Sequence, residues 1–144
     1  MYLSQDQGEN WHQIFDTTQL KKVVLMHCNN SKKVNIQAIA ISDTNWFIGT
    51  RGCGIFRSTN FGKTWIPVNY GLIDPVIEAM TINQNNLVVS TQKGLYISKN
   101  NGASWRSINT GLGRDYLIYS LAFVGNKLYA GTSSGGVFVC SISD

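Results

Sequence analysis

Charged residues are scarce in this 144-residue sequence, at 14% of the total, and proline occurs only twice. The formal net charge is +4, and the 12 lysines and arginines are scattered, with adjacent pairs only at Lys21-Lys22 and Lys32-Lys33. A nucleic-acid-binding surface concentrates more positive charge than this. Hydrophobic residues make up 43% of the chain, which is typical of folded rather than disordered proteins. We therefore expect a globular chain without a nucleic-acid partner.

Long hydrophobic runs are also missing. No apolar stretch approaches the roughly 20 residues of a membrane-spanning helix, so we expect no membrane partner. The opening "MYLSQDQGEN" has neither the basic nor the apolar region of a secretory signal. This predicts a cytoplasmic location, unless an export signal precedes the sequence.

Cysteine and histidine are few. Cys28, Cys53 and Cys140 are odd in number and irregular in spacing, which does not indicate a disulfide framework. His12 and His27 form no pair at metal-ligand spacing with one another or with the cysteines. We therefore expect neither a metal site nor a cofactor. Cys140 replaces a serine of the repeat described next and is predicted to be a small buried side chain.

Glycine, in contrast, is frequent, with 14 residues, and some of it belongs to a repeat. The octapeptides "SQDQGENW" (4–11), "STNFGKTW" (58–65) and "SKNNGASW" (98–105) all fit Ser-x-[Asp/Asn]-x-Gly-x-x-Trp. The glycines of the second and third copies are 40 residues apart. A fixed period of this length indicates a repeat architecture.

Each repeat contains four short apolar segments separated by Gly, Asn, Asp and Ser clusters, as expected for strands joined by tight turns. No segment sustains a helical period over three turns, which predicts an all-β chain without a substantial helix. Four antiparallel strands in roughly 40 residues match one blade of a β-propeller. The first strand of each blade is the most uniformly apolar and is predicted to lie innermost. Its copies include 38–41 and 79–82.

The repeat divides the single domain 1–144 into blades. An extra strand is predicted at 23–26, with a turn at 29–31, because the chain departs from its own repeat there. The predicted units are a half blade at 1–16, an inserted strand and loop at 20–34, full blades at 35–70 and 76–110, and an incomplete last blade at 117–144.

The octapeptide falls between the third and fourth strands, so we interpret it as their hairpin. Its Asp or Asn can accept main-chain N–H bonds within the turn, and its Gly tolerates a positive φ. Its Trp begins the fourth strand, and burial between blades would contribute about 2–3 kcal/mol. The predicted structural positions are Ser4, Asp6, Gly8, Trp11, Ser58, Asn60, Gly62, Trp65, Ser98, Asn100, Gly102 and Trp105.

The octapeptide pattern resembles the Asp-box, or BNR (bacterial neuraminidase repeat), motif. The first copy keeps Asp6, whereas the other two carry Asn60 and Asn100 at that position. The resemblance covers the chain apart from 20–34, and it implies a β-propeller. Similar repeats occur in sialidases, xyloglucan-degrading glycosidases, sortilin-type receptors and photosystem II assembly propellers. In these proteins the box is structural, so the resemblance implies a fold and not a reaction.

Two sets of residues are candidates for a site. Asp74, Glu78 and Asp115 lie in or beside loops that precede inner strands, where a paired-carboxylate glycosidase centre is conceivable. We favour the alternative that they are solvated loop acids. Tyr70 and Tyr116 lie in similar connections, and exposed aromatics there can bind a ligand.

The blade count has a consequence for assembly. The sequence holds about three to three and a half blades, and a propeller needs at least about four to close. Either the chain is part of a larger propeller, or a second copy completes the ring as a homo-oligomer, for which we expect a dimer. We expect a non-catalytic binding or scaffolding module that recognises a protein or a glycan. The alternative is a remnant or subunit of a glycoside hydrolase.

Overall fold

The computed structural model describes residues 2–13, 17–28, 35–112 and 117–143, and most of their regular structure is antiparallel β-sheet. Two four-stranded sheets and one three-stranded sheet follow each other along the chain, and we call them the first blade, the second blade and the last sheet. The first blade contains β3 (Ile36–Ile41), β4 (Trp46–Thr50), β5 (Ile55–Ser58) and β6 (Ile66–Pro67). The second blade contains β7 (Ile77–Asn83), β8 (Asn86–Thr91), β9 (Gly94–Ser98) and β10 (Arg106–Ser107). The last sheet contains β11 (Ile118–Val124), β12 (Lys127–Thr132) and β13 (Val137–Ser141).

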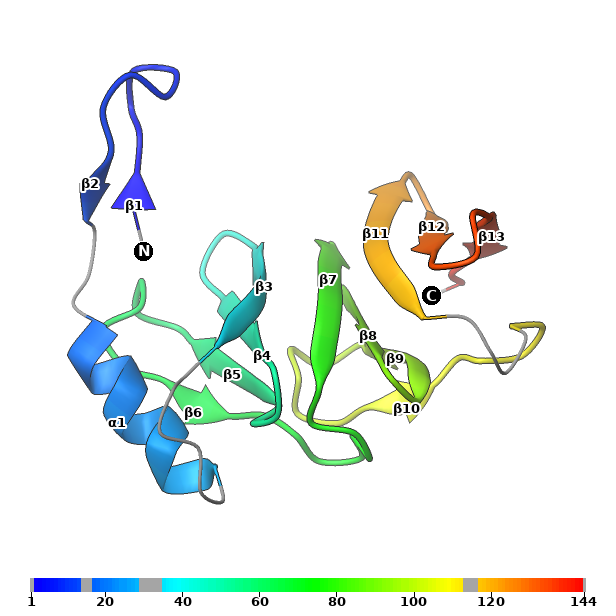
Figure 1. Cartoon of the computed structure of the whole chain (residues 1–144), viewed down its shortest axis with the longest axis horizontal. Helices are drawn as coiled ribbons and strands as arrows, with labels where there is room; N and C mark the ends of the chain where they lie inside the picture. The colour runs from blue at the N-terminus through cyan, green and yellow to red at the C-terminus, as the bar shows by residue number, and fades with distance from the viewer. Residues whose placement is uncertain (1, 14–16, 29–34, 113–116, 144) are drawn as a thin grey trace.

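The three sheets stack side by side, and their first strands, β3, β7 and β11, are neighbours along the stack (Figure 1). Each sheet is a simple meander in which every strand pairs with the next along the chain. The pairing shifts register once near the start of each first strand, between Ile36 and Ala38 in β3 and at the equivalent residues of β7 and β11. The described sheets form an open arc rather than a closed ring. This is the predicted architecture of a partial propeller.

Apolar clusters hold neighbouring sheets together. Between the two blades, Phe47 and Ile55 pack with Leu87, Tyr96 and other buried side chains. Between the second blade and the last sheet, a second cluster includes Val88 and Ile97 of one and Leu128 and Ala130 of the other. The side chains of one strand alternate between these clusters because successive residues of a strand face opposite sides of the sheet.

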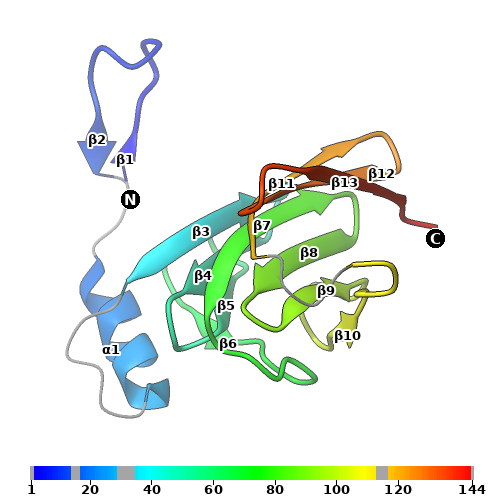
Figure 2. The ribbon, with the colours of Figure 1, turned by 45° about the vertical axis from the view of Figure 1, so that its right-hand side comes forward.

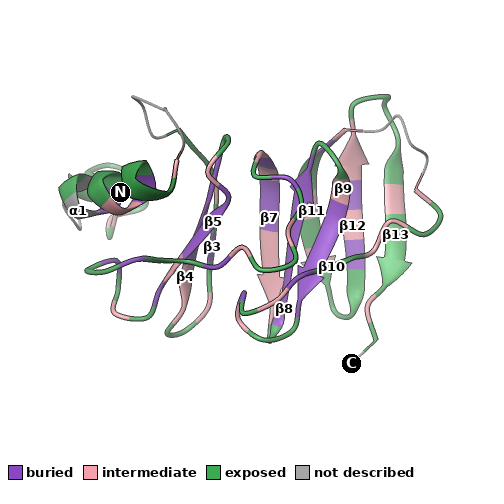
Figure 3. Ribbon diagram, turned by 90° about the horizontal axis from the view of Figure 1, so that it is seen from below, coloured by how far each residue is buried: buried purple, intermediate pink, exposed green. Residues whose placement is uncertain are grey.

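The predicted strand at 23–26 is wrong, and so is the expectation that the chain has no substantial helix. Residues Thr17–His27 form helix α1, which covers the face of the first blade away from the second blade (Figure 3). Leu20 and Val24, one helical turn apart, are buried against Ile48 and Phe56 of that blade. The run Val23-Val24-Leu25-Met26 has the composition of a strand, but tertiary packing decides its conformation.

Two expectations about cysteine are also wrong. Cys28, just after α1, forms a disulfide with Cys53 in the connection between β4 and β5, which attaches the helix to the first blade. Cys140 is free and exposed rather than buried. Its position is nevertheless that of the repeat serine, because Cys140 lies opposite Leu128 just as Ser98 lies opposite Leu87.

The N-terminal hairpin consists of β1 (Tyr2–Leu3) and β2 (His12–Gln13) and stands apart from the blades (Figures 1 and 2). Its strands occupy the places of the third and fourth strands of a blade. The hairpin carries the first octapeptide at its tip, as the repeat predicts.

Candidate functional site

The three octapeptide hairpins satisfy their polar groups internally. In each, the Ser hydroxyl donates to the Asp or Asn side chain and accepts the N–H of the Gly, at distances of 2.8–2.9 Å for the latter bond. The Asp or Asn oxygen also accepts the N–H of the residue before the Trp, at 2.9 Å in all three. Because these side chains are already bonded within the turn, the boxes are structural elements and leave few groups for a ligand.

The tryptophans of the three boxes differ in their surroundings. Trp65 and Trp105 are 3% and 6% exposed, whereas Trp11 is 63% exposed. The Trp105 indole N–H donates to the Val68 carbonyl of the first blade at 2.7 Å. The corresponding groups of Trp11 and Trp65 donate to the Gly carbonyl of their own hairpins, at 3.1 and 3.0 Å. Only the second-blade copy therefore uses its indole N–H to join two blades.

The acidic candidates are only partly placed by the described residues, and their catalytic role stays a prediction. Asp74 is 7% exposed, and one of its carboxylate oxygens accepts the Val76 N–H at 3.0 Å within its own loop. Glu78 is partly buried on β7, and Asp115 lies outside the described residues. Burial, with a smaller contribution from the Asp74 charge, raises the pKa of Tyr96.

The aromatic candidates are only partly placed. Tyr70 is 81% exposed in the connection between β6 and β7, at the lower end of the blades in Figure 1. Its main-chain carbonyl accepts the Trp105 N–H at 2.9 Å, so its backbone serves the junction between blades while its side chain faces solvent. Tyr116 lies outside the described residues. The assignment of a ligand to Tyr70 remains a prediction.

The opposite end of the blades carries two clefts that sequence reasoning missed. One, of about 420 Å³, lies between the β3–β4 turn and the β7–β8 turn. The other, of about 490 Å³, lies between the β7–β8 turn and the β11–β12 turn. They share Asn83 and Gln84, so they follow one another across all three sheets. We call their amide side chains the amide track, which comprises Asn45, Asn83, Gln84, Asn85, Asn86, Asn101 and Asn126.

Local structure explains why amides gather there. Asn and Gly favour tight turns between antiparallel strands, and each turn follows an inner strand at the same end of its sheet. The Asn83 side-chain N–H donates to the Gly125 carbonyl at 2.6 Å and thereby links two of the turns. Gln84 and Asn85 are exposed. We interpreted such residues only as turn formers; the presence of an asparagine in each of these turns was the signal for a shared surface.

The carboxamides of the amide track can form hydrogen bonds with uncharged polar ligands. Each carboxamide offers both donors and an acceptor, which suits the main chain of an extended peptide or the hydroxyls of a sugar. Apolar side chains at the edges of the clefts, Ile41 and Ile82 in one and Phe123 and Ile142 in the other, add hydrophobic contact. No group of three His, Cys, Asp or Glu side chains suited to a metal occurs in the described ranges. Likewise, none of the helices in the described part of the chain is long and apolar enough to cross a membrane.

Comparison with known proteins agrees with the repeat and the fold. The model of the "BNR/Asp-box repeat" family matches residues 2–13, which form the N-terminal hairpin. Sortilin from Rattus norvegicus and from Mus musculus is 31% identical over 117 residues. The match takes in 76% of this chain but only 13% of sortilin, so the chain spans a small part of these relatives.

Solved propeller structures superpose on the sheets. YCF48 from Cyanidioschyzon merolae matches with a TM-score of 0.65 and 16% identity, over 99% of this chain and 47% of that protein. A second YCF48 structure, bound to D1 peptide, has a TM-score of 0.53, with 16% identity over 73% of this chain and 35% of YCF48. An ancestral GH74 enzyme matches at 0.59 with 24% identity, over 68% of this chain and 13% of the enzyme. These likenesses concern the fold alone, and they confirm the predicted propeller architecture.

Proposed function

We propose that this chain, an Asp-box repeat protein with the blades of a partial β-propeller, is a non-catalytic module that binds an extended protein segment along the amide track. The observation that carries the proposal is the continuity of the two clefts across three sheets through the shared Asn83 and Gln84. An extended peptide presents N–H and C=O groups at regular intervals, which repeated carboxamides can pair.

A hydrolytic function has less support. The GH74 likeness concerns the fold, and the Asp74 carboxylate is buried, with one of its oxygens bonded within its own loop. A YCF48 structure with a bound D1 peptide is consistent with a peptide ligand on this fold. Sugars also bind to carboxamides, so the experiment has to separate a peptide from a glycan.

The proposal is tested by probing the purified chain on an array of extended peptides, on a glycan array and with chromogenic glycosides. We expect peptide binding that the double substitution Gln84→Ala/Asn85→Ala weakens roughly tenfold, because two exposed amides lose their hydrogen bonds. Both side chains are exposed, so the fold should persist.

Tyr70→Ala is the matched control at the other end of the blades. Loss of binding in this variant alone would move the site from the amide track to the Tyr70 loop. Binding of glycans but not peptides would contradict the proposed ligand class. Hydrolysis of a glycoside at an enzymatic rate would contradict the non-catalytic function.

A further inference from the structure

At the junction between the two blades, Trp105 of the second blade packs against the first blade. Its indole N–H donates to the Val68 carbonyl at 2.7 Å, and its main-chain N–H donates to the Tyr70 carbonyl at 2.9 Å. The approach is close enough to require glycine at position 71, where an added Cβ would lie 2.4 Å from the Trp105 carbonyl oxygen. Trp105 also belongs to the apolar cluster between the blades.

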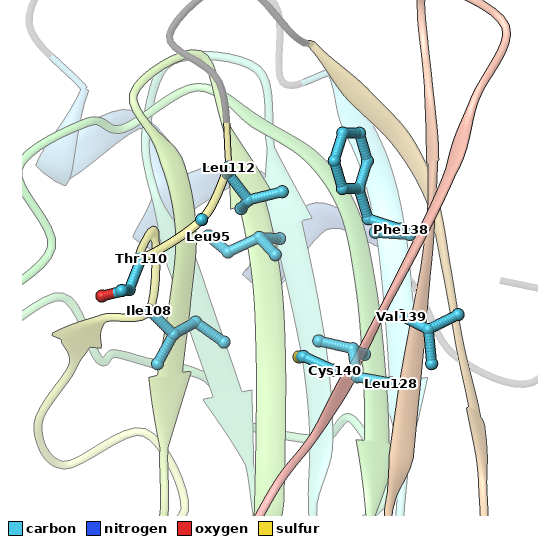
Figure 4. A pocket seen from close by; sticks show the side chains of 10 residues that line it. Leu95, Ile108, Thr110, Leu112, Leu128, Phe138, Val139 and Cys140 are labelled. Atoms are coloured by element: carbon cyan, nitrogen blue, oxygen red, sulfur yellow. The ribbon is translucent and has the colours of Figure 1, made fainter.

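The equivalent place at the next junction is open. Ile108, Thr110 and Gly111 of the second blade are the repeat counterparts of Val68, Tyr70 and Gly71. A Cβ added at Gly111 would meet nothing within 4 Å, in contrast to Gly71. An apolar cavity of about 170 Å³, which we call the junction pocket, lies beside them (Figure 4). Its walls include Leu95, Ile108, Leu128, Ala130, Phe138 and Cys140.

The difference between the junctions has a simple origin. Trp105 immediately precedes β10, the fourth strand of the second blade, whereas the last sheet pairs only β11, β12 and β13. Cys140 of β13 holds the position at which Ser98 begins the box of the second blade. The junction pocket is thus the place that corresponds to the site of Trp105 at the first junction. The last sheet provides no tryptophan to fill it.

The N-terminal hairpin, in contrast, has a tryptophan without a neighbouring blade. Trp11 stands at the box position of Trp105, yet it is 63% exposed because no blade lies against it in the described structure. The hairpin and the last sheet, which supplies part of the pocket wall, lie at opposite ends of the molecule (Figure 1). We propose that the Trp11 side chain of a second copy of this chain fills the junction pocket.

The contacts at the first junction show how Trp11 would bind. Its indole N–H, which donates to its own Gly8 carbonyl at 3.1 Å, would turn to the Ile108 carbonyl, and its main-chain N–H would reach the Thr110 carbonyl. A cavity of roughly 150 Å³ accepts a benzene ring, so the pocket is of the right order for an aromatic side chain. Each chain has one Trp11 and one pocket, so two copies can exchange hairpins reciprocally and close with two-fold symmetry.

The free thiol of Cys140 reports directly on this site, because it lines the junction pocket and the other two cysteines form a disulfide. We expect its reaction with an aromatic disulfide reagent to slow as protein concentration rises, because the docked indole covers it. Burial raises the pKa of the Cys140 thiol, so all rates are compared at one pH. Trp11→Ala should remove the protection by raising the dissociation constant of the dimer roughly 30-fold or more, as loss of a central tryptophan does.

A second variant tests the pocket from the other side. Thr110→Arg places a charge at an exposed position on its rim and should also remove the protection, whereas Tyr70→Ala, at the equivalent position of the first blade, should leave it intact. A Cys140 rate independent of wild-type concentration would overturn the proposal. Protection that survives Trp11→Ala would also overturn it, because another group would then occupy the pocket.

Discussion

The second blade and the last sheet are copies of one repeat, but only the third strand of the second blade is covered by a neighbouring sheet. In the second blade, Leu95 and Ile97 of β9 are 2% and 1% exposed because the last sheet lies against them. Their counterparts in β13, Val137 and Val139, are 68% and 51% exposed (Figure 3). The strands have similar apolar sequences, so burial in this molecule is determined by the neighbouring element rather than by the strand itself.

At the other end of the stack, the outer face of the first blade is covered by a helix instead of another blade. Helix α1 covers the first blade, where Trp65 is 3% exposed, and no sheet lies on that side in the described residues. The molecule therefore has one end capped by a helix and one uncovered end. Exposed apolar sheet surface is a common feature of interaction sites and an aggregation hazard when unoccupied.

The largest expected effect is a difference in the free energy of unfolding between substitutions of a buried and an exposed box tryptophan. Trp105→Ala should lower the free energy of unfolding by about 3–5 kcal/mol, because it leaves a cavity between the blades. Trp11→Ala, at the same box position, should change it by less than about 0.5 kcal/mol in dilute protein. Chemical denaturation measures both values. Equal losses of stability in the two variants would show that burial by a neighbouring blade does not distinguish the two tryptophans.

The next effect concerns the helical cap. Cys28→Ser removes the disulfide that closes a loop of 25 residues between α1 and the first blade. The free energy of unfolding should fall by about 3 kcal/mol, as expected for a loop of this length. Cys140→Ser is the matched control and should have little effect, because Cys140 is free and exposed. An unchanged stability in Cys28→Ser would mean that α1 stays on the blade without the covalent link.

The smallest effect is a pH dependence confined to the uncovered hairpin. Hydrogen bonds from Asn10 and Ser4 lower the pKa of Asp6 from 3.8 to about 2. The folded hairpin thus binds this proton less readily than the unfolded chain, so the stabilisation is complete above pH 3.8 and is lost as the pH falls through about 2. NMR signals of the Gly8 and Asn10 amides should shift in this range.

The covered boxes provide the control for that titration. Asn60 and Asn100 replace the aspartate and do not titrate. The amides of Thr64 and Ser104, which bond to these asparagines, should therefore show no matching transition. A common transition in all three hairpins would point to global acid unfolding instead.

The repeat made much of the fold predictable. The shared pattern of the three boxes, with 40 residues between the glycines of the second and third, located the hairpins and the inner strands. The fourth strands of the two blades are short, Ile66–Pro67 and Arg106–Ser107, and the Trp predicted to begin each of them lies just before it. Beyond them the chain leaves the sheet to form the contacts between blades.

Features outside the repeat could not be read in this way. Helix α1 occurs once, and the burial of Leu20 and Val24 depends on a surface of the first blade that local composition does not reveal. The disulfide joins Cys28 to Cys53 across this contact, so its pairing follows from the helix. Cys140 was expected to be buried because it replaces the serine of the repeat. Its counterpart Ser98 is buried, but the last sheet has no fourth strand to cover Cys140.

The candidate site illustrates the same limit. Its asparagines were recognisable as turn residues, but their alignment into two clefts depends on how the blades stack. The acids and tyrosines chosen for their chemistry were placed by loop position alone. The structure turns Asp74 inward and Tyr70 outward, a difference that the sequence of a loop does not encode locally.

In the proposed dimer, the N-terminal hairpin of each copy covers the exposed face of the last sheet of the other. The native mass of the wild-type chain, measured by sedimentation over a range of concentrations, distinguishes this dimer from a monomer. The mass should rise with concentration to twice the 16.0 kDa of one chain, and it should return to 16.0 kDa in Trp11→Ala. A wild-type mass of 16.0 kDa at every concentration would contradict the proposed dimer.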